Sequence, residues 1–322
     1  MNNMVISTRI RLARNLNGFS FPHKLNPKDA EEITSRVQNA LAPIIKDFTL
    51  VKMSDVDNVT KQMLAENGTI SPDAANNRLC RVFIKKDGGA EITVNEEDHV
   101  RIQTVRSDDN IDAAFELANR LDDLLDESLS FAFSDKYGYL TVCLTNTGTG
   151  MRASYMLHLP MLEKTKQIKA LESEIGRFGM VIRGSHGEGS EAVGSLYQLS
   201  NQVTLGKSER EIINDLNNIM KQITAKEAAL REKVKGDAAF QDVIFRSLGI
   251  LKFCKTISAK EAMEHLSNVK MGIESGIIKD KEDNIYNIMT DIQPSVIKKK
   301  EGQALSNAEI CKKRAEYLNN KL

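Results

Sequence analysis

The chain has 322 residues, of which 41% are hydrophobic and 27% are charged. Lys plus Arg and Asp plus Glu each number 44, so nothing in the overall charge favours binding to nucleic acid or to a membrane surface. The four cysteines are widely spaced, which excludes a disulfide framework and a C-x-x-C zinc site, and no apolar run approaches the roughly 20 residues that span a bilayer. We therefore expect a cytoplasmic protein of two domains, in which any recognition of charge is local.

The first expected strand covers residues 5–15 and carries Arg9 and Arg11. Residues two apart on a strand point to the same face, so this strand presents two guanidinium groups side by side. Guanidinium groups bind phosphate oxygens in pairs, although a solvated strand face would show the same pattern. A helix is then expected to begin at Asn26-Pro27, with asparagine as the N-cap. The pattern of residues 51–78 gives no clear assignment.

Residues 80–86 and 90–95 are expected to form a hairpin around the turn 87–89, and the return strand ends in an acidic run, Asn95 to His99. Neighbouring carboxylates are costly to bury together unless a cation joins them. The run is therefore either a solvated turn or a site for a metal, an ammonium or a guanidinium.

Further elements are expected in the middle of the chain: strands 100–106, 131–133, 139–144, 152–159 and 178–183, and helices 111–126 and 162–175. Cys143 would lie near the end of one of these strands, and Arg152 at the start of the next. His158 is interpreted as structural.

A glycine-rich stretch follows Arg183 and contains Gly184, Gly187, Gly189 and two acids, Glu188 and Glu191. Glycine permits close backbone approach to a ligand, so the stretch is a candidate flap over an active site, with a plain connector as the alternative. A capping box then opens a long helix that ends near residue 234, and only helices are expected after it. We therefore predict a catalytic domain, 1–234, and a small helical domain, 235–322.

The candidate site combines arginines at the ends of several elements with acids on two others. Arginine forks suit the triphosphate of ATP, and carboxylates can orient a cationic guanidinium and accept its proton. The arginines are Arg9, Arg11, Arg101, Arg152 and Arg183.

Four motifs in residues 5–210 resemble those of the ATP:guanido phosphotransferases: V-I-S-T-R-I-R, N-E-E-D-H-x-R, T-V-C-L-T-N-x-G-T-x-x-R-A-S and R-G-x-x-G-E-x-S-E-A-x-G-x-x-Y-Q-L-S-N. The later runs F-R-S-L-G-I-L-K and S-A-K-E-A-M-E-H-L-S-N-V-K resemble those of bacterial protein-arginine kinases. This resemblance implies an α+β, phosphagen-kinase-like catalytic domain with a large antiparallel sheet flanked by helices, and a small all-α C-terminal domain. The helical domain that small-molecule kinases of the family carry before the first motif is expected to be absent, because that motif starts at residue 5.

By the same resemblance, the five arginines would bind the ATP phosphates. Glu97 would be the base, Glu188 its partner, and Cys143 a residue of the same pocket. Glu96 would contact Mg²⁺ through water, with no direct protein ligand to the metal. Arg314 would contact phosphoarginine, although the first half of the family's phosphoarginine motif is missing here. Met156 stands where many members have a histidine, so adenine contacts are not assigned.

The resemblance implies that the chain phosphorylates arginine side chains of proteins with ATP and Mg²⁺, in bacterial protein quality control and stress response. The implied partners are proteins with exposed arginines, a zinc-containing activator, a heat-shock repressor, the Clp protease machinery and a second copy in a homodimer. Two alternatives stay open: a phosphoarginine-binding adaptor with an inactive kinase domain, and a kinase of free arginine.

Overall fold

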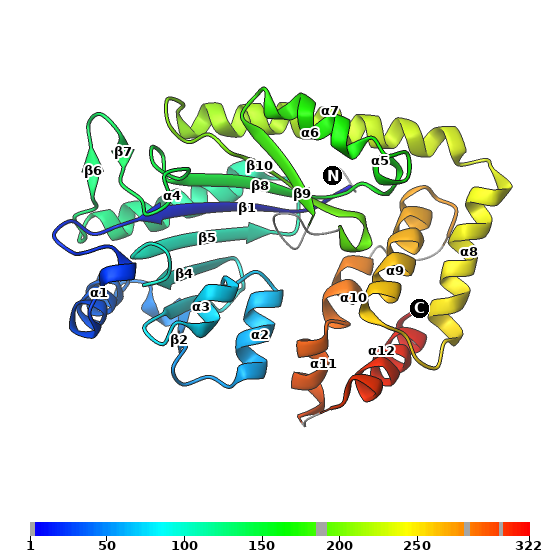
Figure 1. Cartoon of the computed structure of the whole chain (residues 1–322), viewed down its shortest axis with the longest axis horizontal. Helices are drawn as coiled ribbons and strands as arrows, with labels where there is room; N and C mark the ends of the chain where they lie inside the picture. Colours follow the sequence, from blue (N-terminus) through cyan, green and yellow to red (C-terminus); the bar gives the residue numbers. More distant parts are fainter. Residues whose placement is uncertain (1–3, 185–191, 280–283, 303–304) are drawn as a thin grey trace.

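A computed structural model describes residues 4–184, 192–279, 284–302 and 305–322. Its centre is an eight-stranded sheet in the order β2-β3-β4-β5-β1-β8-β10-β9, in which every neighbouring pair is antiparallel (Figure 1). The strands are β1 (Val5–Arg14), β2 (Phe48–Lys52), β3 (Arg81–Lys85), β4 (Ala90–Val94), β5 (Val100–Arg106), β8 (Met151–His158), β9 (Met180–Gly184) and β10 (Leu196–Asn201). The large antiparallel sheet expected from the family resemblance is thus confirmed.

One face of this sheet is apolar and carries the main hydrophobic core. Ile10 and Leu12 on β1, Ile102 on β5 and Tyr155 on β8 are buried there. The helices that contribute to this core include α1 (Pro27–Ala40), α4 (Ile111–Asp126), α6 (Ile168–Gly176) and α7 (Glu209–Val234). Because side chains alternate along a strand, the intervening residues point to the opposite face, where the arginines lie.

The helix termini follow their caps. Asn26 accepts from the backbone N–H of Asp29 at the start of α1, and Ser208 and Glu211 form the predicted capping box of α7. Both arrangements satisfy N–H groups that a helix cannot pair internally, which explains why the sequence predicted these two starts correctly.

Most of the stretch 51–78, whose pattern was unclear, belongs to a small unit with its own core. The helices α2 (Asn58–Glu66) and α3 (Pro72–Asn76) pack with Met53, Leu64, Ile70 and Cys80 against the edge of the sheet.

Two expected elements differ from the structure. The predicted strand 139–144 shrinks to β7 (Gly138–Tyr139), which pairs with β6 (Phe133–Ser134), because the backbone N–H of Val142 donates to the Asp98 carboxylate and not to a strand. The predicted helix 162–175 is two helices, α5 (Pro160–Lys164) and α6, because Lys166 adopts a positive φ of 58° that ends the first one.

Most of the C-terminal helices share a second hydrophobic core with the sheet. They are α8 (Ala238–Phe253), α9 (Ala259–Glu274), α10 (Ile285–Asp291), α11 (Pro294–Glu301) and α12 (Asn307–Lys321). Ile6 of β1, Met161 of α5 and Leu196 of β10 are buried in this core. At the far side, Lys299 of α11 donates to Thr60 of α2 at 2.8 Å, so these helices also touch the small unit (Figure 1).

A buried cluster of charges joins the sheet, α7 and α9. Arg231 pairs with Glu227 at 2.7 Å and with Glu274 at 2.5 Å, and its Nη2 donates to the backbone carbonyl of His158. His158 is fully buried, and its Nε2 lies 2.8 Å from the Ser267 hydroxyl, which confirms a structural role. The contact between the two parts of the chain is therefore ionic as well as apolar.

Candidate active site

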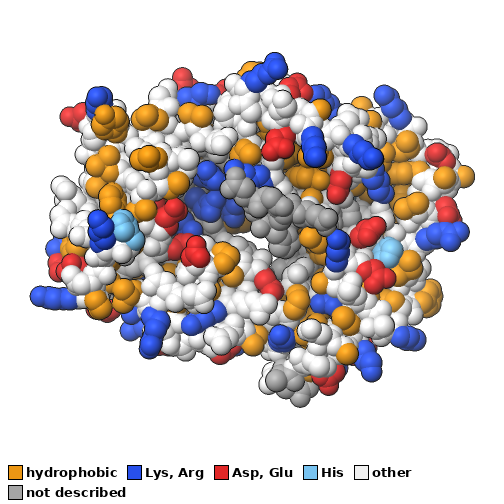
Figure 2. All heavy atoms as spheres, viewed as in Figure 1, with side chains coloured by type: hydrophobic (Ala, Val, Ile, Leu, Met, Phe, Trp, Pro, Cys, Tyr) orange, Lys and Arg blue, Asp and Glu red, His pale blue; other side chains and the backbone are white. Residues whose placement is uncertain are grey.

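The strand register brings the predicted arginines to one face of the sheet. Arg11 on β1 lies opposite Arg152 on the neighbouring strand β8. On its other side, Arg11 lies opposite Gln103 of β5, which is two residues from Arg101 and therefore shares its face of the sheet. Partners directly across a sheet share a face, so these side chains project together. Arg183 on β9 lies opposite Gln198 on β10, which lies opposite Met156 on β8, and this row belongs to the same face. Lys and Arg side chains gather in a central hollow of the surface (Figure 2).

The arginines are held charged at an energetic cost. Burial, followed by repulsion from Arg101, lowers the pKa of Arg9 to about 10. Burial, followed by repulsion from Arg9 and Arg101, lowers the pKa of Arg11 well below its usual range. A polyanion placed among these two groups would relieve their mutual repulsion.

Arg9 is the point at which three parts of the chain meet. Its Nη2 donates to Gln198 at 2.8 Å, and a Cβ added to Gly68 would lie 3.7 Å from its Nη1. The third neighbour is Tyr286 of α10, whose pKa burial raises and the Arg9 charge lowers. Sequence reasoning assigned none of the three to the site: Gln198 lies within a recognised family motif, whereas no local pattern marks Gly68 or Tyr286, whose proximity to Arg9 follows only from the tertiary fold.

A polar layer lies beside these arginines. Glu96 pairs with Arg101 at 2.7 Å, and Gln103 donates to the Gly68 carbonyl at 2.9 Å and to Glu91 at 3.3 Å. Burial raises the pKa of Glu91 to about 7. The pairing of Glu96 with a candidate phosphate-binding arginine fits an indirect role near Mg²⁺ and leaves less of its carboxylate free for a metal.

The acidic turn is rigid. Asn95 adopts a φ of 60° and its Nδ2 donates to the Ala30 carbonyl at 2.8 Å, while Asp98 is buried and accepts from Asn15 at 2.6 Å. Asp98 thus anchors the turn, and its neighbour Glu97 is exposed. Although part of Glu97 is open to solvent, the surrounding turn desolvates its carboxylate, and this desolvation, then repulsion from Asp98 and Glu96, raises the pKa of Glu97, which suits a group that accepts a proton.

Cys143 lies against the same turn. The backbone N–H of Val142 donates to Asp98 at 2.9 Å, which ties the loop of Cys143 to the residue beside Glu97. The Cys143 thiol lies 3.0 Å from the Thr145 hydroxyl and is partly exposed. This hydrogen bond links the loop of Cys143 to the turn of Glu97, and a shared pocket for the two side chains stays a prediction.

Two predicted site residues stand apart. Glu188 lies outside the described residues, so its position relative to Glu97 stays a prediction. Arg314 is only 2% exposed, and its guanidinium donates to the backbone carbonyls of Ile292 and Ile257 at 2.9 and 3.0 Å. Its donors thus link helices of the C-terminal core, and this arrangement does not support the expected contact with phosphoarginine.

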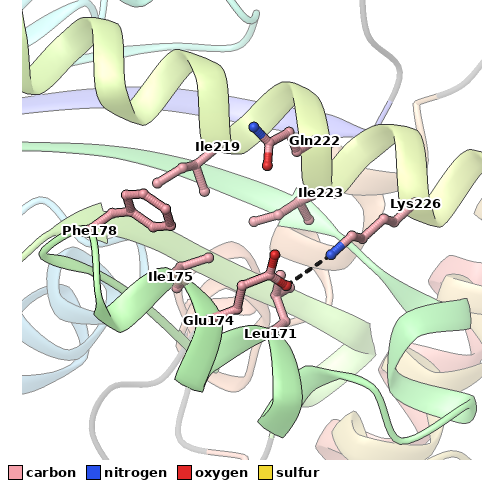
Figure 3. Close-up of a pocket in the computed structure, with 8 residues that line it drawn as sticks. All are labelled: Leu171, Glu174, Ile175, Phe178, Ile219, Gln222, Ile223 and Lys226. Carbon is pink, nitrogen blue, oxygen red and sulfur yellow. Dashed lines mark hydrogen bonds and ion pairs between the residues drawn. The ribbon is translucent and has the colours of Figure 1, made fainter.

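An apolar hollow on the other side of the sheet lacks chemistry of this kind. Figure 3 shows that α6 and α7 line it, with Phe178 at one end and a Lys226–Glu174 ion pair of 3.0 Å at the other. Within the described ranges, no group of three His, Cys, Asp or Glu residues could hold a metal ion. The arginine face is therefore the candidate active site.

Comparisons with known proteins agree with this assignment. The family model for the ATP:guanido phosphotransferase C-terminal catalytic domain matches residues 30–230, and the model for the protein-arginine kinase McsB C-terminal domain matches residues 237–322. Among solved structures, the taurocyamine kinase of Schistosoma mansoni is similar with a TM-score of 0.65 and 25% identity, over 76% of this chain and 37% of that one. A lombricine kinase is similar with the same TM-score and identity, over 72% and 68% of the two chains. Fold and site together define an ATP:guanido phosphotransferase.

The full-length relatives are more specific. A protein-arginine kinase of Clostridium novyi is 42% identical over 99% of this chain and 95% of its own length. One of a Geobacillus species is 40% identical over 100% of this chain and 91% of its own length. The chain belongs to the family of the bacterial protein-arginine kinases.

Proposed function

We propose that this chain transfers the γ-phosphoryl group of ATP to the guanidinium group of arginine side chains in proteins. The observation that carries this proposal is the arrangement of five arginines from four strands on one sheet face, beside the acidic turn whose Glu96 pairs with Arg101. The family relationship supports the identity of both substrates.

In this reaction the arginine side chains hold the triphosphate and Glu97 orients the acceptor guanidinium. Glu97 accepts a proton from a guanidinium nitrogen, whose lone pair then forms a bond to the γ-phosphorus while the bond from this phosphorus to the bridging oxygen of ADP breaks. The leaving electron pair stays on that oxygen, where the arginine charges stabilise it. By family resemblance, Glu188 would be the second carboxylate at the acceptor.

By family resemblance, Mg²⁺ would reach the site with ATP, held mostly by the nucleotide and water. When bound, it would offset part of the phosphate charge. Glu96, already paired with Arg101, would contact it through water.

The wider setting is also a proposal. We place the chain in the cytoplasm, in protein quality control and stress response, with a zinc-containing activator, a heat-shock repressor and the Clp protease machinery as partners. No described helix combines the length and hydropathy that a membrane span requires. The proposed division into a catalytic domain, 1–234, and a helical domain, 235–322, is supported by the two separate family matches.

A homodimer is the proposed assembly. Helix α8 leaves four apolar side chains exposed, which would be covered in a dimer. They are Val243, Phe245, Ile250 and Phe253.

The test is phosphorylation of a casein-like protein with ATP and Mg²⁺, run with and without the activator, with phosphoarginine detected by mass spectrometry. Glu97→Gln should abolish the product while ATP binding persists, and Glu172→Gln, on the exposed side of α6, is the matched control. ATP binding with no product in any arm would favour the phosphoarginine-binding adaptor. Equal turnover of free arginine would favour the free-arginine kinase.

A further inference from the structure

Three exposed apolar side chains surround the edge of the site that carries Cys143. They are Phe133 at 57% exposure, Leu144 at 85% and Leu205 at 52%, and we call them the acceptor rim. Figure 2 shows hydrophobic side chains gathering over the β6–β7 end of the molecule, beside the hollow that holds the Lys and Arg side chains. A Leu side chain this exposed gains free energy when a partner covers it.

Close backbone contacts hold the rim segments together. The Thr204 hydroxyl donates to the carbonyls of Thr145 and Thr147 at 2.9 and 2.7 Å. Gly148 has a φ of 119°, and a Cβ there would lie 2.3 Å from the Thr204 carbonyl oxygen, so only glycine allows this approach. The segments of Leu144 and Leu205 are therefore fixed against each other.

The β6–β7 hairpin joins the same assembly. The backbone N–H of Tyr139 donates to the Gly148 carbonyl at 2.8 Å, and the Phe133 and Tyr139 rings lie 5.2 Å apart. Through these contacts Phe133 belongs to the same surface as Leu144 and Leu205.

The rim is continuous with the place where the acceptor arginine must arrive. Leu144 directly follows Cys143, and the Val142 N–H bond to Asp98 ties this loop to the turn of Glu97. Adjacent residues of a peptide are only about 3.8 Å apart at their Cα atoms, so residues flanking a bound arginine must pass over the nearest surface of the site. The exposed apolar residues of α8 have no such connection to Glu97.

We propose that the acceptor rim binds an apolar side chain next to the target arginine, so that the enzyme prefers protein segments in which an apolar residue flanks the arginine. This inference rests on the proposed function. It assigns a specificity surface to the acceptor side of the site.

The test uses two peptides of equal length and charge, each with one arginine, flanked by leucine in one and by serine in the other. At saturating ATP, wild-type enzyme should phosphorylate the leucine peptide with a kcat/KM about tenfold higher, chiefly through KM, as expected for one apolar contact. Leu144→Ser and Leu205→Ser should each reduce the preference to about twofold, without changing the KM for ATP or turnover of the serine peptide. Phe253→Ser, on the exposed face of α8, is the control and should keep the full preference.

Three results would overturn the rim: equal use of both peptides by wild type, equal loss on both peptides in Leu144→Ser, or loss of the preference in Phe253→Ser. Binding of the labelled peptides, measured by fluorescence anisotropy without ATP, separates this inference from the proposed activity. If neither peptide is phosphorylated but the leucine peptide still binds about tenfold tighter, the proposed activity is refuted while the proposed binding role of the acceptor rim is supported. If the enzyme is active but shows no preference in either assay, the proposed activity is supported and the proposed role of the acceptor rim is refuted.

Discussion

Replacing Arg9 with methionine should stabilise the ligand-free protein and weaken ATP binding. Burial and neighbouring arginines lower the pKa of Arg9 to about 10. Each pKa unit corresponds to about 1.4 kcal/mol, so the cost of holding this charge has an upper limit of about 3 kcal/mol. Because Arg9 is partly open to solvent, we expect its removal to raise the free energy of unfolding by only about 1–2 kcal/mol. Loss of the hydrogen bond to Gln198 should offset up to about 1 kcal/mol of this gain.

Calorimetry measures both effects. The melting temperature of ligand-free Arg9→Met should rise by roughly 1–3 °C. It should rise by more in the double variant Arg9→Met/Gln198→Leu, which also removes the Gln198 amide that has lost its hydrogen-bond partner. ATP affinity, measured by titration, should fall by about tenfold or more, the loss of one charge-assisted contact to phosphate. Arg246→Met, on the exposed face of α8, is the control and should change neither quantity appreciably. A lower melting temperature with unchanged ATP affinity would show that Arg9 is a structural residue, contrary to this reasoning.

Three further predictions concern other parts of the chain. On the acidic side of the pH–rate profile, activity should be lost at a pH above the usual carboxyl range, because the raised pKa of Glu97 keeps this base protonated and inactive to higher pH. Loss of activity only near pH 4 would exclude Glu97 as the base. Arg231→Met should destabilise the protein by about 3 kcal/mol in urea unfolding, because it leaves a net negative charge in the buried cluster even though Glu274 keeps Lys270 and Glu227 keeps its backbone donors, and adding Glu274→Gln should recover part of the loss. Tyr286→Ala should raise the KM for ATP severalfold while Tyr317→Ala, on α12, does not, because of these two only Tyr286 faces Arg9; equal effects would indicate a general loss of stability.

Local patterns were sufficient to predict the arginine strand. Arg9 and Arg11 are two apart on β1, and alternation alone places them on one face. The hairpin of β3 and β4 and the capped helix starts were also predictable, since each depends on a few neighbouring residues. What these patterns do not contain is the strand order, so the approach of Arg11 to Arg152 on β8 needed either the family resemblance or the structure.

The errors have the same physical origin. Residues 139–144 have an apolar pattern suited to a strand, but a side chain distant in sequence, Asp98, takes the backbone N–H that a strand would use. Gly68 and Tyr286 approach Arg9 from separate parts of the fold, and neither has a local signal of function. Tertiary contacts of this kind determine which residues form the site, but they produce no periodic pattern or motif in the sequence.

Two arginines on β1 show how burial separates structural from binding residues. Arg14 points to the side opposite Arg11, and its guanidinium is satisfied by Asp122 at 2.7 Å and by the Thr149 carbonyl at 3.0 Å. Arg11 lies instead beside Arg9, Arg101 and Arg152, and burial, followed by repulsion from these arginines, depresses its pKa. A buried cation with complete partners stabilises the fold, whereas one placed among other cations is stabilised by an anion that the fold itself does not provide. By this criterion Arg314, with its backbone acceptors, belongs with Arg14, whereas the arginine face of the sheet has the character expected of the proposed phosphate site.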